Sequence, residues 1–191
     1  MEVEIRGSLR KKEALSIIKR LCSDCSTLFE TVIFFRQNDL DFRIKWDKEK
    51  DYFLFVYKSK IGNQRIIREE IEVKILKSEL KKFLKILEIL GFKEGFVSST
   101  QRIDFENKGI LWSFKFGAII GDYWEAEASD KLKKNFKKQN EILAYLKKEA
   151  NSLGLKFWSE DEFKRLRKEK WAKIRPVPIK RLTKILLNEE T

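Results

Sequence analysis

Carboxylates recur at every second position near both ends of the first 130 residues, and this spacing could hold a divalent cation. Residues 2–6 read Glu-Val-Glu-Ile-Arg, and residues 123–127 read Tyr-Trp-Glu-Ala-Glu. Because successive side chains of a strand point to opposite faces, each segment would carry its two glutamates on one face. Carboxylate oxygens are hard ligands of the kind that Mg²⁺ and Mn²⁺ prefer. The two segments therefore predict a metal site built on strands.

Basic side chains follow the same alternation between these two segments, where they could balance the carboxylates or bind a polyanion. Each segment would carry one apolar face and one charged face of mixed sign. Two arrangements fit this pattern: an open sheet with its charged face in water, and a barrel whose charged faces line a tunnel. The alternating charged residues are Arg43, Lys45, Lys58, Lys60, Arg68, Glu70, Glu72, Lys74, Arg102, Asp104 and Glu106.

Antiparallel strands and a few helices are the elements that must position these side chains. Alternation of aromatic and β-branched residues predicts strands, and apolar positions three and four residues apart predict helices. Closure into a barrel would remove the exposed edges. We therefore expect an α+β fold of eight antiparallel strands with flanking helices, either an open sheet or an eight-stranded antiparallel closed barrel with a charged interior. The predicted strands cover residues 2–6, 28–36, 40–47, 51–60, 64–76, 96–106, 110–117 and 123–127, and the predicted helices cover 9–24, 79–90, 130–152, 159–173 and 179–187.

Local signals mark several ends of these elements. Ser78 and Asp130 are predicted to cap helix N-termini, and Ser159 forms a capping-box pattern with the glutamate three residues later. Residues 62–63 (Gly-Asn) and 107–109 (Asn-Lys-Gly) predict tight turns. Strands joined by such turns are expected to be antiparallel neighbours.

The chain is basic, and its charge is unevenly distributed. Its 191 residues carry a formal net charge of +12, and 42% of them are hydrophobic, enough for a folded core. Residues 131–191 contain 18 Lys or Arg and 8 Asp or Glu, so the excess lies near the C-terminus. Nucleic acid is therefore a candidate partner of this segment. We expect one domain at residues 1–173, with its C-terminal helices, followed by a basic tail at 174–191.

The composition excludes several kinds of site. The chain has no histidine, which removes the Ser-His-Asp triad and mixed Cys/His zinc sites. Cys22 and Cys25 are too few for a four-cysteine site, and their position late in a predicted helix favours a structural role over a redox motif. No apolar run reaches the roughly 20 residues of a membrane span, and no signal segment opens the chain. A cytoplasmic monomer or homodimer without a membrane partner is expected.

The order of the motifs resembles the CYTH family, which includes class IV adenylate cyclases, thiamine triphosphatases and inorganic triphosphatases. The family's opening Glu-x-Glu-x-Lys is similar to residues 2–6, and its Leu-Arg-Ile-Arg strand is similar to Phe-Arg-Ile-Lys at 42–45. Its closing Leu-Gly-x-Phe-x-Glu-x-Glu resembles residues 120–127. The resemblance covers residues 1 to about 170 and implies an eight-stranded triphosphate tunnel. Further matches are Lys58, Arg-Glu-Glu-Ile-Glu at 68–72, Leu-Gly-Phe at 90–92 and Leu-Gly at 153–154.

Three departures separate the chain from the family pattern. The usual Lys-x-Arg after Leu-Gly-Phe is Thr-Gln-Arg at 100–102, and the usual Asp-Tyr-Phe near the second strand is absent, with Phe-Phe-Arg at 34–36. Lys115 stands where the family has an acidic metal ligand, six residues before the closing glycine. This lysine would repel a second metal ion or bind a phosphate oxygen in its place, so we expect weak activity with one metal ion.

The resemblance and the charge pattern together imply a role for each charged residue. Phosphate binding is expected from Arg6, Arg43, Lys45, Lys58, Arg68, Arg102 and Lys115. Binding of Mg²⁺ or Mn²⁺ is expected from Glu2, Glu4, Glu70, Glu125 and Glu127. Of the basic residues, Arg6, Lys58 and Arg102 are also expected to act in catalysis.

Metal-dependent hydrolysis of a triphosphate compound is the predicted function. Candidate substrates are inorganic tripolyphosphate, thiamine triphosphate and a nucleoside triphosphate. Phosphoryl transfer depends on positioning and charge more than on covalent help from the protein, so the lack of histidine is no obstacle. Two alternatives stay open: a class IV adenylate cyclase that forms cyclic AMP from ATP, and a non-catalytic module that binds polyphosphate, nucleotide or nucleic acid.

Overall fold

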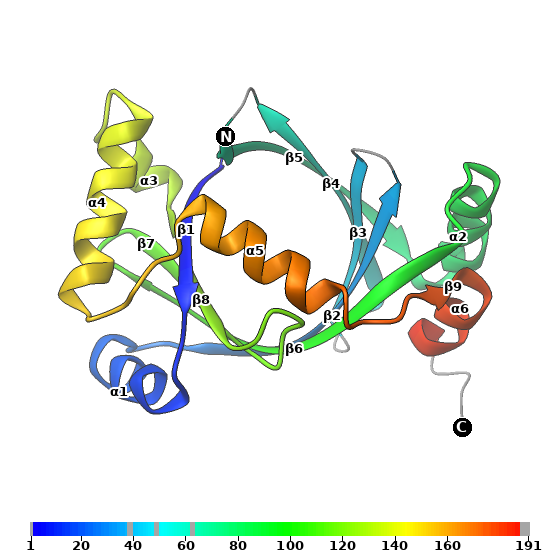
Figure 1. The fold of residues 1–191 in the computed structure, drawn as a ribbon, viewed down its shortest axis with the longest axis horizontal. Helices are drawn as coiled ribbons and strands as arrows, with labels where there is room; N and C mark the ends of the chain where they lie inside the picture. Colours follow the sequence, from blue (N-terminus) through cyan, green and yellow to red (C-terminus); the bar gives the residue numbers. More distant parts are fainter. Residues whose placement is uncertain (1, 38–39, 48–49, 62–63, 188–191) are drawn as a thin grey trace. The chain divides into compact units, whose positions relative to one another are not determined.

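The computed structural model describes residues 2–37, 40–47, 50–61 and 64–187 and shows an α+β chain built on an antiparallel sheet (Figure 1). The described chain has nine strands in the order β2-β3-β4-β5-β1-β8-β7-β6-β9, and β2 also pairs with β6. The predicted antiparallel sheet with flanking helices is confirmed, whereas its closure into a barrel stays a prediction. The strands are β1 (Glu2–Ser8), β2 (Ser26–Gln37), β3 (Leu40–Asp47), β4 (Tyr52–Ile61), β5 (Gln64–Leu76), β6 (Glu94–Asn107), β7 (Ile110–Phe116), β8 (Tyr123–Ala128) and β9 (Val177–Pro178).

The chain divides into two compact units. The first contains residues 1–28, 60–68 and 100–171, and the second contains residues 29–59, 69–99 and 172–191. No helix in the described ranges has the length and apolar character needed to cross a membrane. The helices are α1 (Lys11–Leu21), α2 (Leu80–Ile89), α3 (Asp130–Lys133), α4 (Gln139–Ser152), α5 (Glu160–Trp171) and α6 (Ile179–Leu187), with a 3-10 turn η1 at Lys77–Glu79.

In the first unit, helices pack on the apolar face of β1, β7 and β8. Trp112 and Trp124 are buried there, with their ring centroids 5.9 Å apart. Ile17 of α1 and Leu146 of α4 belong to the same core. Because the apolar side chains of these strands face the helices, the alternate side chains lie on the opposite face.

The second unit has a core of its own between its strands and two helices. Phe35, Ile44 and Phe53 are buried in it, together with Leu84 of α2 and Leu182 of α6. The short strand β9, which the sequence did not predict, pairs with the start of β6. This pairing leads the chain directly into α6, in agreement with the helix predicted at 179–187.

The single helix predicted over residues 130–152 is wrong, because capping bonds divide it into α3 and α4. Ser129 caps α3 in place of Asp130, and its Oγ accepts a hydrogen bond from the Leu132 amide at 3.3 Å. The Glu141 carboxylate accepts a bond from the Lys138 amide at 3.2 Å, which starts α4 anew. Each cap satisfies an amide that a continuous helix would bond internally.

Two further predictions in the second unit are corrected. Ser78 lies inside η1, and the N-cap position of α2 is Glu79, whose side chain makes no capping bond. On β5 the alternation predicts a buried apolar face, yet Ile71 and Val73 are 50% and 52% exposed and Ile75 is buried. The core of this unit reaches β5 at Ile75, and burial of a strand face requires an element packed against it.

Several local predictions are confirmed. The Ser159–Glu162 capping box is present, with the Glu162 amide donating to Ser159 Oγ at 3.2 Å and the Ser159 amide donating to Glu162 Oε2 at 2.7 Å. The β6–β7 turn has a positive φ at Lys108 and at Gly109, as a two-residue hairpin of this type requires. The position of Cys22 and Cys25 late in a helix is corrected, because α1 ends at Leu21 and the two cysteines follow it and form a disulfide. The turn predicted at 62–63 lies outside the described residues.

Candidate functional site

The register of β1, β8, β7 and β6 places charged residues from all four strands on one face of the first unit, called the charged face below. Residues directly opposite each other in an antiparallel pair point to the same side. Intervening residues such as Ile5, Phe114 and Trp124 are buried on the other side. One row across the strands is Arg6, Glu125, Ser113 and Asp104, and the next row is Ser8, Tyr123, Lys115 and Arg102.

Two cations and two carboxylates form the centre of the charged face. Arg6 is paired with Glu4 on its own strand, and its Nη1 lies 3.6 Å from Glu125 Oε1 on β8. Glu125 is also hydrogen-bonded to the Lys115 ammonium of β7. Glu4 is 9% exposed and the other three side chains are 16–18% exposed, so water screens these charges only partly.

A second group lies beside this centre, on the β6–β7 hairpin. Arg102 Nε lies 2.8 Å from Asp104 Oδ2. The Ser113 hydroxyl donates to the other oxygen of Asp104 at 2.6 Å. Asp104 and Arg102 therefore form an ion pair along one strand, and the second oxygen of Asp104 accepts a hydrogen bond from Ser113 on the adjacent strand.

Lys133, from α3, supplies a cation to the remaining row of the face. Its Nζ lies 3.2 Å from Glu127 Oε1, and Glu127 is opposite Glu4 in the β1–β8 register. Burial would lower the pKa of Lys133, but the hydrogen bond and negative charge of Glu127 outweigh burial and raise the pKa above its usual value. Two like charges placed opposite each other on neighbouring strands are thus each held by a cation.

Tyr123 brings a phenol next to these charges. Its ring lies 5.2 Å from Lys115 Nζ, on the same face as Glu125. Burial, with the negative charge of Glu125 as a further cause, raises the pKa of the Tyr123 phenol above its ordinary value. The phenol therefore stays protonated at neutral pH and can donate a hydrogen bond.

Titration of the four tyrosines should reveal this environment. We expect Tyr123 to ionise at a higher pH than the ordinary value of about 10, because burial favours the neutral phenol. Absorbance of phenolate followed from neutral to alkaline pH would measure this. The Tyr123→Phe protein should lose phenolate absorbance that forms above this ordinary value, and an unchanged titration curve there would contradict the assignment.

The start of helix α5 lies beside β1 (Figure 1). The Phe163 ring covers the Arg6 guanidinium at 4.6 Å, and the Trp158 amide donates to the Arg6 carbonyl at 2.9 Å. The Trp158 ring is 5.7 Å from Phe163 and 6.2 Å from Tyr123. These aromatic contacts hold the start of α5 beside Arg6 and Tyr123.

Gly7 on β1 permits the approach of the segment that leads into α5. A Cβ atom at this position would lie 1.9 Å from the Lys156 carbonyl oxygen. We expect Gly7→Ala to displace this segment and to release Phe163 and Trp158 from the charged face, because a backbone carbonyl cannot rotate away as a side chain can. Increased solvent quenching of Trp158 fluorescence would measure the displacement.

The fluorescence signal of Trp158 is identified by introducing Trp158→Phe into both the unmodified protein and the Gly7→Ala variant. Gly154→Ala is no suitable comparison because φ is positive there. Ser8→Ala, on the same strand, is a better control, because it adds no atom near Lys156. Unchanged quenching in Gly7→Ala would contradict the close approach.

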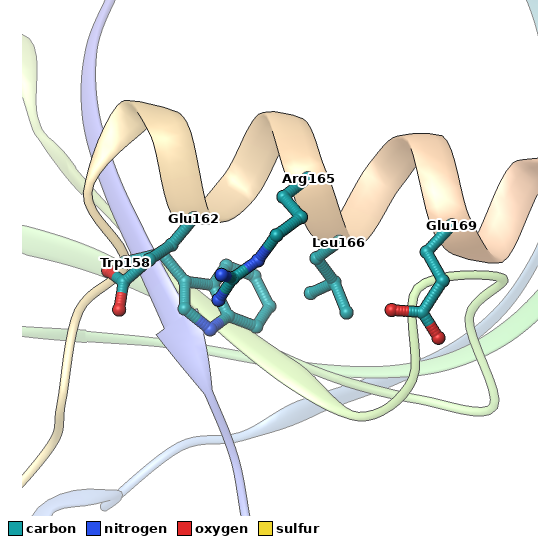
Figure 2. A pocket seen from close by; sticks show the side chains of 5 residues that line it. All are labelled: Trp158, Glu162, Arg165, Leu166 and Glu169. Atoms are coloured by element: carbon teal, nitrogen blue, oxygen red, sulfur yellow. The ribbon is translucent and has the colours of Figure 1, made fainter.

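A small cavity of about 190 Å³ opens on α5 next to these aromatic residues. Figure 2 shows Arg165, Leu166 and Glu169 pointing to the side of the helix where Trp158 lies. Glu162 also lines the cavity, and its carboxylate is bonded in the capping box of α5. The cavity is thus lined by one aromatic ring and by charges of both signs. Trp158, which lines it, is also bonded to the Arg6 carbonyl through its amide.

The second unit carries a separate cluster of charges on β3 and β5. Lys45 Nζ lies 3.0 Å from Glu70 Oε1 and 2.9 Å from Glu72 Oε1. Burial would lower the pKa of Lys45, but the charges and hydrogen bonds of the two glutamates outweigh burial and raise it. On β3, the Arg43 guanidinium lies 5.1 Å from the Phe34 ring centroid.

The predicted site residues fall into three groups. The charged face of the first unit contains Glu4, Arg6, Arg102, Lys115, Glu125 and Glu127. The second unit contains Arg43, Lys45 and Glu70. The side chains of Glu2, Lys58 and Arg68 lie outside the described residues, although the register pairs the backbones of Glu2 and Arg68. The phosphate-binding, metal-binding and catalytic roles of all these residues stay predictions.

Several residues of these clusters were not among the predicted site residues, although Asp104 was part of the charged alternation of its strand. Asp104 and Ser113 could have been paired from the turn at 107–109, since a two-residue loop sets the register of the hairpin. Lys133 and Phe163 come from helices after the sheet, and no local pattern predicts where these helices pack. Tyr123 is on the same face as Glu125, so alternation alone could have indicated it.

The carboxylates of the charged face do not fit a divalent cation as they are arranged. Among the described residues, no three acidic side chains are grouped so that they could hold a metal ion. Glu4 is paired with Arg6, Glu125 with Lys115, and Glu127 with Lys133. Each predicted ligand of this face therefore already has a cation of the chain itself beside it.

Solved structures share this fold at low sequence identity. The PH1012 protein from Pyrococcus horikoshii is 16% identical, with a TM-score of 0.68 over 85% of this chain and 93% of that chain. A candidate adenylate cyclase from Bacillus halodurans is 14% identical, with a TM-score of 0.60 over 86% and 96%. A candidate adenylyl cyclase from Hippeastrum with a dominant triphosphatase activity is 14% identical, with a TM-score of 0.59 over 88% and 96%.

The likeness to these structures confirms the predicted resemblance at the level of the fold. No family model matches the sequence, and no curated protein matches it. At 14–16% identity, structural likeness shows a shared arrangement of strands and helices, and the activity depends on the side chains of the site.

Proposed function

We propose that the charged face binds the triphosphate group of a small molecule and that the protein hydrolyses this group. The observation that carries the proposal is the placement of Arg6, Arg102 and Lys115 in adjacent rows of one partly buried face. Guanidinium and ammonium groups bind phosphate oxygens by charge-assisted hydrogen bonds, which strengthen where water is partly excluded. The shared fold and the triphosphatase activity ascribed to the Hippeastrum protein support the same direction.

The proposed reaction breaks one bond of the triphosphate. A water oxygen forms a bond to the terminal phosphorus, the bond from that phosphorus to its bridging oxygen breaks, and a proton is released to solvent. Arg6, Arg102 and Lys115 would orient the phosphate oxygens and stabilise negative charge on the leaving oxygen. The protonated phenol of Tyr123 would donate a hydrogen bond to one of the phosphate oxygens.

A closed tunnel is part of this proposal. The additional pairing of β2 with β6 supports closure, because these strands are otherwise far apart in the sheet order. Mg²⁺ or Mn²⁺ as cofactor, nucleic acid as a partner of the basic tail, the domain limits at 173 and 174, and a cytoplasmic monomer or homodimer all stay predictions.

Two observations favour other functions of the same site. The fold is shared with candidate adenylate cyclases. In a cyclase reaction, a ribose hydroxyl of the nucleotide would attack the α-phosphorus in place of water. The pairing of Glu4, Glu125 and Glu127 with cations of the chain favours a module that binds polyphosphate without turnover.

One assay separates these functions. Tripolyphosphate, ATP and thiamine triphosphate are each incubated with the protein, with Mg²⁺, with Mn²⁺ and with EDTA, and orthophosphate, pyrophosphate and cyclic AMP are measured. Release of orthophosphate supports the proposed hydrolysis, and cyclic AMP with pyrophosphate supports the cyclase. Binding by calorimetry with neither product supports the module, and no binding of any of the three would refute the proposal.

Arg102→Met tests the phosphate-binding face directly. We expect tripolyphosphate to bind about 2–5 kcal/mol more weakly, because a partly buried charge-assisted contact is lost. Arg102→Lys should recover part of the affinity, since it keeps the charge without the planar fork. Isothermal titration calorimetry measures both, with Arg10→Met as a control on an exposed arginine of the same unit. Equal affinity of Arg102→Met and the unmodified protein would exclude Arg102 from the site.

A further inference from the structure

The ion pairs of the charged face have a consequence for its ligands. Lys115 contacts Glu125 from the adjacent strand, and Arg6 contacts the same carboxylate from the other side. A divalent cation bound to Glu125 would have to enter beside one or both of these groups. We propose that Lys115 takes the place of a divalent cation on the charged face, so that the free protein has no divalent-cation site at Glu125.

Burial strengthens the repulsion by which Lys115 keeps a divalent cation away from Glu125. The side chains of Lys115 and Glu125 are 16% and 18% exposed, so the repulsion between the ammonium and an entering dication is only partly screened. Arg6 adds a second positive charge 3.6 Å from the same carboxylate. Lys133 beside Glu127 and Arg6 beside Glu4 extend the arrangement to two further carboxylates of the face.

The inference gives Glu125 a role opposite to that of a metal ligand. A polyanion that binds Lys115 and Arg6 has to compete with the carboxylate of Glu125 for both cations. Neutralising Glu125 should therefore strengthen the binding of tripolyphosphate in the absence of metal. If Glu125 instead held a metal ion that bridges to phosphate, the same change would weaken binding.

The inference rests on the proposed function for its ligand, so its first test uses the protein and Mn²⁺ alone. Electron paramagnetic resonance of Mn²⁺ reports the free ion. We expect the unmodified protein to leave the signal unchanged at about 1 mM Mn²⁺, the concentration that corresponds to weak binding. Lys115→Asp should bind Mn²⁺ at least about tenfold more tightly, since it replaces a repelling charge by a ligand.

Three variants make this test specific. Lys115→Arg keeps the charge and should still exclude Mn²⁺, and Lys115→Met should bind Mn²⁺ to an intermediate degree. Lys108→Met removes a cation paired with Glu149 at 2.8 Å, away from the charged face, and should behave like the unmodified protein. Circular dichroism verifies folding, and Lys115→Met carries the test if the aspartate variant does not fold.

A second test measures tripolyphosphate by calorimetry in EDTA. Glu125→Gln should bind it about tenfold more tightly than the unmodified protein, because two competing ion pairs are removed. Glu149→Gln, the matched control, should leave the affinity unchanged. If none of these proteins binds tripolyphosphate, the proposed function fails and the Mn²⁺ result decides the inference alone. Mn²⁺ binding to the unmodified protein as tight as to Lys115→Asp, or weaker tripolyphosphate binding by Glu125→Gln, would overturn it.

Discussion

Arg6→Met is expected to lower the free energy of unfolding by about 3–5 kcal/mol, because it leaves a buried carboxylate without its counter-charge. Glu4 is 9% exposed and is paired with Arg6, whereas Glu125 keeps Lys115 after the change. The methionine also loses the contact of the guanidinium with the Phe163 ring. Urea denaturation followed by tryptophan fluorescence measures the change.

The double variant Arg6→Met/Glu4→Gln should recover part of this loss, since no unpaired charge then remains at residue 4. Arg10→Met is the matched control, because Arg10 is 86% exposed and its pair with Glu13 has a distance of 3.7 Å. Exposed pairs of this kind contribute roughly 0–1 kcal/mol. A loss in Arg6→Met no larger than that in Arg10→Met would show that the Glu4–Arg6 pair does not stabilise the first unit.

Trp124→Ala is expected to cost about 3–5 kcal/mol of stability, because it leaves a large cavity in the core of the first unit. Trp124 is fully buried on β8 and packs against Trp112. In the described chain its indole nitrogen has no hydrogen-bond acceptor, so the loss is one of packing and buried apolar area. Chemical denaturation measures it, followed by circular dichroism because a tryptophan is removed.

Trp124→Phe should lose clearly less than Trp124→Ala, since the phenyl ring fills part of the cavity and no satisfied hydrogen bond is broken. Ile89→Ala on α2 is the surface control, because this side chain is 74% exposed. Its effect should stay within about 0.5 kcal/mol, as for most surface changes. A cost of Trp124→Ala as small as that control would mean that the core closes around the missing ring.

Strand β8 connects the core of the first unit to the charged face. Trp124 and Glu125 are neighbours on β8, so the residue that anchors the strand in the core also sets the position of the carboxylate on the opposite face. A rigid strand keeps Lys115, Arg6 and Glu125 at fixed separations. In the proposed function, Lys115 and Arg6 held in this way would stabilise a polyanion that displaces the carboxylate of Glu125.

The charged and apolar faces of β1, β7 and β8 could be predicted from the order of residues alone. A strand has a side-chain period of two residues in any fold, so Glu125 and Glu127 had to share a face opposite Trp124. The turn at 107–109 and the capping box at 159–162 were predictable for the same reason, since both depend on neighbouring residues.

The partners of the charged residues could not be predicted in this way. Lys133 reaches Glu127 because capping bonds at Ser129 and Glu141 break one expected helix into two, and Phe163 reaches Arg6 because α5 packs beside β1. These contacts join residues far apart in the chain, and their geometry depends on how whole elements pack. The metal ligands predicted from the spacing of carboxylates are paired with arginine and lysine for this reason: alternation determines which face a side chain occupies, and packing determines which charge lies next to it.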